Sequence, residues 1–273
     1  MKLYISADIE GCAGVVSFQH LSPEGFEYRE AREWMTGEVL AAIEGARAGG
    51  AQQVVVSDSH GNGQNLILDR MPPDVEVVRS WPRPLQMSQG LESDAFSAVM
   101  LLGYHSGHTE PAGVLAHTLI GAFYEVRLNG QPANETRLNA AIAGHFGVPV
   151  VLVTGDAAYV ESALRLLPDV EAVVTKWSSG DYSTRTLMPA RARELIREAA
   201  QRAMRRAAKI KPYTISTPIT LDLVFKQRLP AEVLSLLRDV ERTSATAVRY
   251  VARDMIDLTH FLVVASSYKA DLR

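Results

Sequence analysis

The sequence predicts an α/β fold, with a mostly parallel sheet flanked by helices and a smaller C-terminal α+β domain. Two observations predict the sheet. Short apolar runs alternate with longer stretches of helical period, and these runs are apolar at consecutive positions, as strands buried on both faces are. A change in composition and in the pattern of predicted elements after Met188-Pro189 predicts the second domain.

The first part of the chain alternates strand and helix. Residues 3–6 form the first predicted strand. A helix follows over residues 27–48, where apolar side chains recur every three or four positions, and Gly49-Gly50 ends it. Further apolar runs predict three more strands, at residues 54–56, 75–78 and 98–102.

The next segment predicts a hairpin and two more helix–strand units. Residues 124–128 read as a strand that leads into Asn129-Gly130, a pair of residues typical of a tight hairpin turn. A helix is predicted over residues 135–146 and a buried strand over residues 150–153. After another helix, the run at 172–174 predicts a further strand.

The C-terminal part differs in composition, and we place a boundary near residue 189, which divides the chain into residues 1–188 and 189–273. Pro189 suits the first turn of a helix that runs to about residue 208. Beyond it, the pattern predicts a strand from Ile219, a short helix from Pro230 and a strand at Ala247–Val251. A final helix follows. The predicted helix is strongly basic, which indicates a solvated or subunit-contacting face, because no nucleic-acid motif accompanies it.

Composition excludes several classes of protein. The net charge is −3, with 47% hydrophobic and 22% charged residues, so nothing predicts binding to nucleic acid or to an anionic membrane. No apolar run approaches the length of about 18 residues that a membrane span needs, and no signal-peptide pattern opens the chain. The single cysteine, Cys12, excludes an intramolecular disulfide and indicates a reducing cytoplasm.

Acids and histidines follow three of the predicted strands. Asp8 and Glu10 come after the first strand, His60 after the second and His105 after the strand at 98–102. In an open parallel sheet, ligands bind beyond the carboxyl ends of the strands, so neighbouring strands would bring these side chains to one edge. Carboxylates and imidazoles are ligands of zinc and similar metals, and one carboxylate can bridge two ions.

Each of these residues also has an ordinary interpretation. Asp8 and Glu10 suit a solvated loop or a helix cap, and His60 suits a surface turn. His117, in a moderately apolar stretch, suits a core histidine bound to a backbone carbonyl, or a general acid or base. Glu135 suits the first turn of a helix, where the helix dipole favours an acid.

Common catalytic motifs are missing from the sequence. It contains no G-x-x-x-x-G-K-[ST] phosphate loop, no G-x-S-x-G nucleophile elbow and no H-E-x-x-H zinc motif. Cys12 lies four residues beyond Asp8, but we interpret it as a small buried side chain, because the other signals describe metal chemistry.

Five short motifs carry the acids and histidines. They are S-A-D-I-E-G at 6–11, D-S-H at 58–60, G-Y-H at 103–105, the segment around His117, and N-E-T-R-L-N at 134–139. In this order they resemble the motifs of bacterial zinc D-aminopeptidases of the dipeptide-transport (Dpp) type. The resemblance covers essentially the whole chain, and the first two motifs are a fairly specific pair.

The resemblance implies a site and an assembly. The family has a centre of two zinc ions per subunit and a catalytic side chain beside the metals, here His117. The implied zinc ligands are Asp8, Glu10, His60, His105 and Glu135, with Asp8 as the bridge. Residues 1–188 would be the metal-binding catalytic domain, and residues 189–273 would supply assembly contacts. The family assembles as a decamer of two stacked pentameric rings around an inner chamber.

The expected function is that of a cytoplasmic metallo-aminopeptidase that releases N-terminal amino acids, those of D configuration by resemblance, from short peptides. Two alternatives stay open from the residues alone: a two-metal amidase or phosphoesterase, and a non-enzymatic α/β binding protein. The sequence also leaves open whether His117 moves protons or attacks the substrate directly.

Overall fold

A seven-stranded sheet forms the centre of the molecule in a computed structural model that describes residues 1–267. Its strands lie in the order β3-β2-β1-β4-β7-β8-β9, and all neighbours are parallel except β8 and β9. The strands are β1 Lys2–Ala7, β2 Gln53–Asp58, β3 Glu76–Val78, β4 Ala98–Tyr104, β7 Val150–Asp156, β8 Glu171–Gly180 and β9 Ser183–Thr186. The predicted mostly parallel sheet is confirmed.

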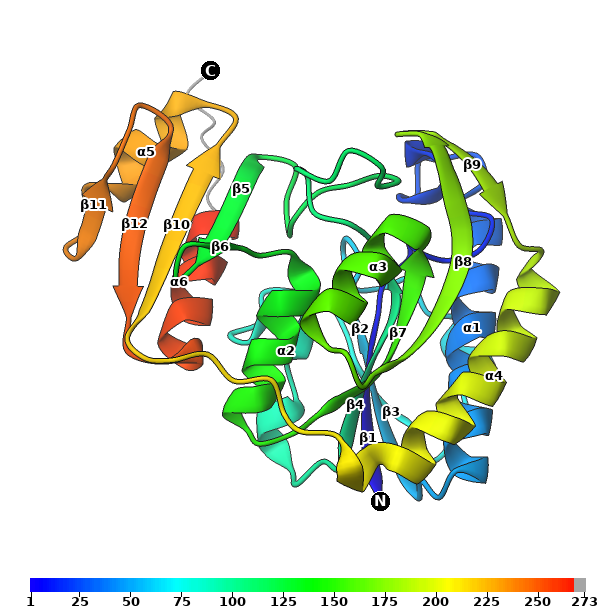
Figure 1. The fold of residues 1–273 in the computed structure, drawn as a ribbon. Helices are drawn as coiled ribbons and strands as arrows, with labels where there is room; N and C mark the ends of the chain where they lie inside the picture. Colours follow the sequence, from blue (N-terminus) through cyan, green and yellow to red (C-terminus); the bar gives the residue numbers. More distant parts are fainter. Residues whose placement is uncertain (268–273) are drawn as a thin grey trace.

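Helices cover both faces of this sheet (Figure 1). Helices α1 (Tyr28–Ala48) and α4 (Pro189–Arg206) pack against each other and share one apolar core with the sheet. Helices α2 (Glu135–His145) and α3 (Ala157–Leu166) contribute to a second core on the opposite face. The sheet is therefore buried on both sides, which explains why its strands are apolar at consecutive positions.

A second, antiparallel sheet stands beside α2, on the left in Figure 1. Its strand order is β11-β12-β10-β5-β6. The strands are β5 Phe123–Leu128, β6 Gln131–Pro132, β10 Ile219–Phe225, β11 Val240–Arg242 and β12 Ala247–Ala252, and the accompanying helices are α5 Arg228–Leu234 and α6 Met255–Ser267. Side chains of α2 and α6 enter the core of this sheet, so α2 is shared between both parts of the molecule.

The predicted elements are present, with ends that shift by a few residues. The hairpin turn at Asn129-Gly130 joins β5 to β6 as expected. Two short strands, β9 and β11, were not predicted. Strand β8 also runs to Gly180, beyond the predicted run at 172–174, because its later residues are largely polar and leave no apolar run in the sequence. Short 3₁₀ helices lie at Phe18–His20, Leu68–Arg70, Gln86–Ser88, Leu91–Ser93 and Ala207–Lys209.

The proposed domain division at residue 189 stays a prediction, and the two sheets do not divide the chain at that point. Strands β5 and β6 precede residue 189 but pair with β10 in the second sheet. Helix α4 follows it but packs against α1 in the first layer. The chain therefore enters the second sheet, returns to the first, and enters the second again.

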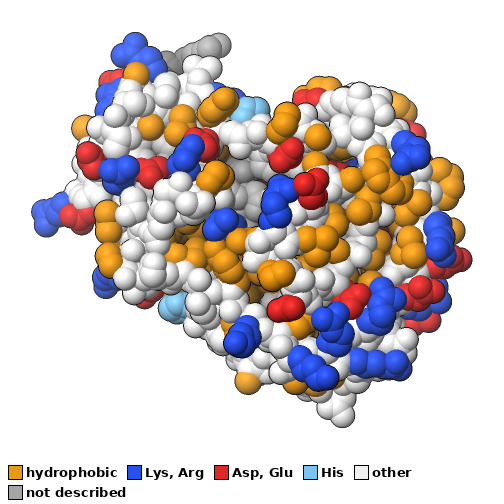
Figure 2. Space-filling model, viewed as in Figure 1, with side chains coloured by type: hydrophobic (Ala, Val, Ile, Leu, Met, Phe, Trp, Pro, Cys, Tyr) orange, Lys and Arg blue, Asp and Glu red, His pale blue; other side chains and the backbone are white. Residues whose placement is uncertain are grey.

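The basic residues of helix α4 lie mainly on its solvent-facing side. Its small and apolar residues face the core, whereas arginines lie on the outer surface, where Lys and Arg side chains gather in the lower right of Figure 2. Arg202 and Arg206 form exposed ion pairs with Glu171 of β8. Within residues 1–267, no helix combines the length and the apolar character that crossing a membrane requires.

Candidate metal centre

Three adjacent strands deliver the predicted site residues to one edge of the sheet. Strand β1 lies between β2 and β4, and all three run parallel. Asp8 follows β1 directly, His60 lies two residues beyond β2, and His105 follows β4 directly. Connections leave β1 toward β2 on one side and reach β4 on the other, so the strand order reverses here, which is where open α/β sheets bind ligands.

Asp8 occupies the middle of the cluster. Its Oδ1 atom lies 3.2 Å from Nδ1 of His60, and its Oδ2 atom lies 3.5 Å from Nε2 of His105. The two oxygens of one carboxylate therefore face two different imidazoles. Glu10 approaches the first of them, with Oε2 at 2.8 Å from His60 Nδ1.

Glu135 joins the cluster from a different element. It is the first residue of α2, whose N-cap Asn134 accepts the backbone N–H of Arg137. One oxygen of Glu135, Oε1, accepts the Leu119 backbone N–H at 2.7 Å, and the other, Oε2, lies 3.4 Å from His105 Nε2. The helix start thus places Glu135 opposite the end of β4.

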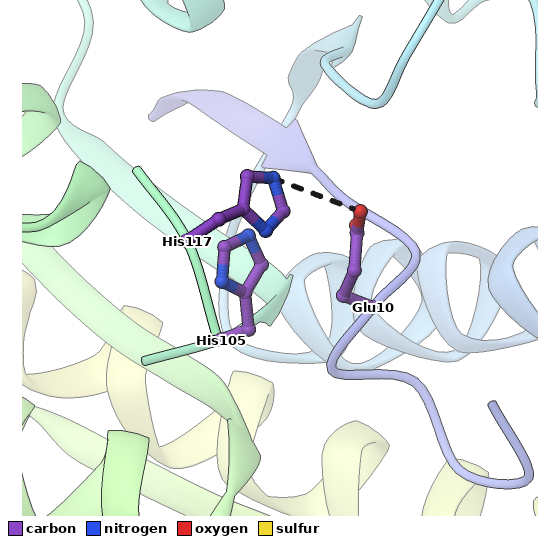
Figure 3. A group of neighbouring side chains, drawn as sticks. All are labelled: Glu10, His105 and His117. Atoms are coloured by element: carbon purple, nitrogen blue, oxygen red, sulfur yellow. Dashed lines mark ion pairs between the residues drawn. The ribbon is translucent and has the colours of Figure 1, made fainter. Parts of the chain in front are cut away.

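His117 lies beside these residues on an irregular segment. Its ring lies against that of His105 (Figure 3). The two rings are stacked, with centroids 4.1 Å apart and planes at 15°. Its Nδ1 donates to the Leu115 carbonyl at 2.8 Å, and its Nε2 lies 3.9 Å from Glu10 Oε1. The side chain of His117 is 27% exposed, whereas that of His105 is 1% exposed.

Potential ligand atoms converge in three overlapping groups. Within each group the atoms lie within 4.8 Å of one another. The groups are Asp8, Glu10 and His60; Asp8, His105 and Glu135; and Glu10, His105 and His117. The structure therefore brings together all six residues that sequence analysis selected, and Asp8, Glu10 and His105 each belong to two of the groups.

Hydrogen bonds fix which imidazole nitrogen faces the cluster. His60 Nε2 donates to the Leu21 carbonyl at 2.8 Å, and His105 Nδ1 donates to the Ser106 carbonyl at 2.9 Å. The remaining nitrogen of each ring points at carboxylate oxygens. This arrangement, with one nitrogen bonded to a carbonyl and the other directed into the site, is the one that metal-binding histidines adopt.

Burial makes the electrostatics of the cluster unusual. Burial, with the neighbouring Glu10 carboxylate, raises the pKa of Asp8 to about 7. Burial acts in the same direction on Glu10, but His60 outweighs it and holds the pKa of Glu10 well below its usual range. Burial would lower the pKa of His60, yet Glu10 and Asp8 hold it well above the ordinary value.

The donor set fits a metal cation. His105 Nε2 and Glu135 Oε2 are buried and have no hydrogen-bond partner among the described residues. Buried carboxylates that lie together are unfavourable unless a positive charge compensates them. Oxygen and imidazole donors of this kind suit zinc, and a carboxylate with one oxygen toward each histidine suits a bridge between two ions.

A cavity of about 600 Å³ opens onto the cluster. One wall is the loop that carries Trp81 and Gln86, and another is α6 of the second sheet, through Val263 and Ser266. A hydrogen bond of 3.0 Å from Gln86 Nε2 to Ser266 Oγ joins these walls. The second part of the molecule therefore helps to enclose the site that the first sheet presents.

Two neighbours of the cluster have supporting roles that sequence analysis missed. The Asp58 carboxylate accepts the backbone N–H groups of Asn65 and Leu66 at 2.6 and 2.7 Å, and so shapes the turn that carries His60. Buried Arg83 donates to Ser57 Oγ and to the Asp58 carbonyl. Nothing in the local sequence around Arg83 indicates this role, because its partners are distant in the chain. Cys12 is buried and outside the three groups, as expected.

Comparison with known proteins places this chain in a family. The family model for peptidase M55, described as D-aminopeptidase, matches residues 1–264. A D-aminopeptidase of Bacillus subtilis (strain 168) is 31% identical over 265 residues, which cover 97% of this chain and 96% of the relative. The structure of "Zn-dependent D-aminopeptidase DppA from Bacillus subtilis, a self-compartmentalizing protease" matches with a TM-score of 0.93 at 29% identity, over 99% of each chain.

These matches confirm the resemblance and the α/β class predicted from sequence. They also confirm the prediction of a metallo-aminopeptidase, and they favour it over a phosphoesterase and over a non-enzymatic binding protein. Because the family model and the relative both extend over nearly the whole length, the chain belongs to the peptidase M55 family of D-aminopeptidases.

Proposed function

We propose that this chain is a zinc-dependent aminopeptidase that removes N-terminal D-amino acids from short peptides. One observation carries the proposal: the two oxygens of buried Asp8 face His60 on one side and His105 on the other, beside a cavity. Glu10 completes the first group and Glu135 the second. We assign Asp8, Glu10, His60, His105 and Glu135 as ligands of two zinc ions, with Asp8 as the bridge.

In the proposed hydrolysis, the metal ions and His117 have separate roles. Zinc, when bound, supplies Lewis acidity toward the scissile carbonyl and activates the attacking water. His117 moves the proton: the bond from its Nδ1 to the Leu115 carbonyl leaves Nε2 as the atom that accepts a proton from water and returns it to the leaving amine. The carbon–nitrogen bond then breaks to give a free amino acid and a shortened peptide.

The cavity sets the size of the substrate. Its volume of about 600 Å³ lies within the range of small-molecule sites and suits a short peptide. Leu119, Ile120 and Val263 give part of its lining an apolar character. A free terminal amine can bind close to the carboxylates, which accounts for cleavage from the end of a peptide.

The same family resemblance supports an assembly and a location. We propose a decamer of two pentameric rings, in line with the description of DppA as self-compartmentalizing. Residues 189–273 would supply contacts in that assembly. A cytoplasmic location accords with the single cysteine. Native mass spectrometry counts the subunits directly, and a monomer at micromolar concentration would contradict the decamer.

An assay with three substrates tests the proposed function. We expect the purified chain, supplied with zinc, to release D-alanine from D-Ala-D-Ala and to act more slowly on L-Ala-L-Ala. A generic phosphodiester should remain intact. Cleavage of the phosphodiester alone would contradict the peptidase assignment, and the absence of both bound metal and turnover would support a binding protein.

Substitution of the bridge should remove metal. In Asp8→Ala both groups of ligands lose an oxygen, so we expect fewer than two zinc ions per subunit by elemental analysis after dialysis. Exposed Asp169→Ala is the matched control and should bind zinc as the unmodified protein does. Retention of both ions by Asp8→Ala would count against the bridging role.

Substitution of His117 should instead spare the metal. In His117→Ala the five assigned ligands are intact, so zinc content should not change, whereas kcat should fall at least about 10²-fold, as expected for a lost acid–base group. Exposed His145→Ala, on α2, serves as the control. Full activity in His117→Ala would remove this residue from the mechanism.

The wall formed by α6 should influence which side chains fit. In Val263→Trp a bulky ring enters the cavity, so we expect kcat/KM for a peptide with N-terminal D-Phe to fall about 10-fold or more relative to D-Ala-D-Ala. The neighbouring Val264 is 52% exposed and does not line the cavity, so Val264→Trp is the matched control. An equal decrease in kcat/KM for both peptides would show that Val263 does not discriminate between substrate side chains.

A further inference from the structure

Lys176 is a completely buried lysine in the middle of β8, and it lies behind the metal cluster. Its ammonium group donates to three backbone carbonyls, those of Glu10, Cys12 and Val15. The bond to Val15 measures 2.5 Å and that to Cys12 3.1 Å. An ammonium has three N–H donors, so all of its hydrogen bonds are made to one turn of the chain.

That turn, residues 10–15, begins with Glu10, and we call it the Glu10 turn. Other elements hold it as well. Thr175 Oγ1 donates to the Gly11 carbonyl at 2.6 Å, and the Gly11 N–H donates to the Gly103 carbonyl at 2.7 Å. The contact with β4 is so close that a Cβ at Gly11 would lie 1.9 Å from the Tyr104 carbonyl oxygen.

Further bonds fix the remainder of the Glu10 turn. Buried Glu38 of α1 accepts the Ala13 N–H at 2.8 Å, and Thr186 of β9 accepts the Gly14 N–H at 2.9 Å. More than half of the backbone N–H and carbonyl groups of the turn thus have a partner on a surrounding element. Lys176 differs from the other partners, because one cationic side chain binds three carbonyls at once.

A buried charge is a costly way to satisfy three carbonyls. Among the described residues, no carboxylate forms an ion pair with the Lys176 ammonium; burial lowers the pKa of Lys176, and the buried acids Asp156, Glu38 and Glu10 act in the opposite direction. Neutral donors would satisfy the same carbonyls at less desolvation cost. The buried ammonium therefore stabilises the fold less than neutral donors would. What it does is fix the position of the backbone beside Glu10.

The position of that backbone matters because Glu10 has two separate tasks. Its Oε2 lies 2.8 Å from His60 Nδ1, and its Oε1 faces His117 Nε2 at 3.9 Å. A displacement of the Glu10 main chain by about one ångström would disturb both contacts together, and geometry errors of that size are known to reduce function strongly.

We propose that Lys176 is a positioning residue for Glu10, which sets the zinc affinity of the centre through the Glu10 turn and takes no part in proton transfer. The inference rests on the ligand assignment proposed above. It predicts that loss of the ammonium weakens zinc binding while the capacity for turnover survives at saturating zinc.

The test measures zinc affinity by competition with a chromogenic chelator, in the full chain. For Lys176→Met we expect an affinity 10- to 100-fold weaker than in the unmodified protein, the range found when outer partners of metal ligands are removed. At saturating zinc, kcat for D-Ala-D-Ala should return to within a few-fold of the original value. Exposed Lys209→Met, just beyond α4, is the matched control and should change neither quantity.

A milder variant covers the case in which Lys176→Met fails to fold. Thr175→Val preserves shape and removes the hydroxyl, which lies 2.6 Å from the Gly11 carbonyl and 3.0 Å from that of Gly155, so it should weaken zinc binding in the same direction by a smaller factor. Unchanged affinity in every folded variant would overturn the proposal, and so would a kcat that stays low at saturating zinc. If the unmodified chain binds no zinc, the ligand assignment itself fails, which is a distinguishable result.

Discussion

The burial of three carboxylates in one place is the constraint on which the rest of the structure depends. Asp8, Glu10 and Glu135 are each about 97% buried; Asp8 and Glu10 lie beside His60, and Asp8 and Glu135 lie beside His105. Without a cation, such a group repels itself, and the rise in the pKa of Asp8 to about 7 expresses that repulsion together with burial. A dication removes the conflict, so the residues that destabilise the folded chain are the ones that give it affinity for metal.

The topology explains how one chain supports such a cluster. Strand β1 is central and parallel to both neighbours, so residues just beyond β1, β2 and β4 meet at one edge of a rigid sheet. Helix α2 then adds Glu135 from outside the sheet, and because α2 also enters the core of the second sheet, it ties the cluster to α6 on the far side of the cavity. Glu135 is in the first turn of α2, whereas Asp8, Glu10, His60 and His105 lie in the short segments just beyond β1, β2 and β4. The walls of the cavity come from loops and from the second part of the molecule.

The sequence predicted most of the fold and the part of the site that obeys a simple geometric rule. Asp8, Glu10, His60 and His105 follow apolar runs, and the rule that ligands bind at the carboxyl ends of parallel strands was sufficient to associate them. Glu135 and His117 were assigned only through the family resemblance, because a helix start and an irregular segment with left-handed Leu115 and Leu119 carry no periodic signal. The role of Lys176 could not be predicted, since a lysine in the polar second half of a strand reads as exposed, and its three carbonyl partners are about 160 residues away in sequence.

The contrast between His105 and His117 supports the different tasks proposed for these neighbouring imidazoles. Their rings are stacked and each bonds a carbonyl through Nδ1, so local chemistry does not distinguish them. Burial, with His117 beside it, lowers the pKa of His105, which favours the neutral form that a metal ligand needs. Burial would also lower the pKa of His117, but Glu10 and Glu135 outweigh it and raise that pKa, which makes the ring a stronger proton acceptor. The more exposed ring is thus the one suited to exchange a proton with substrate, and the sealed ring is the one suited to bind metal.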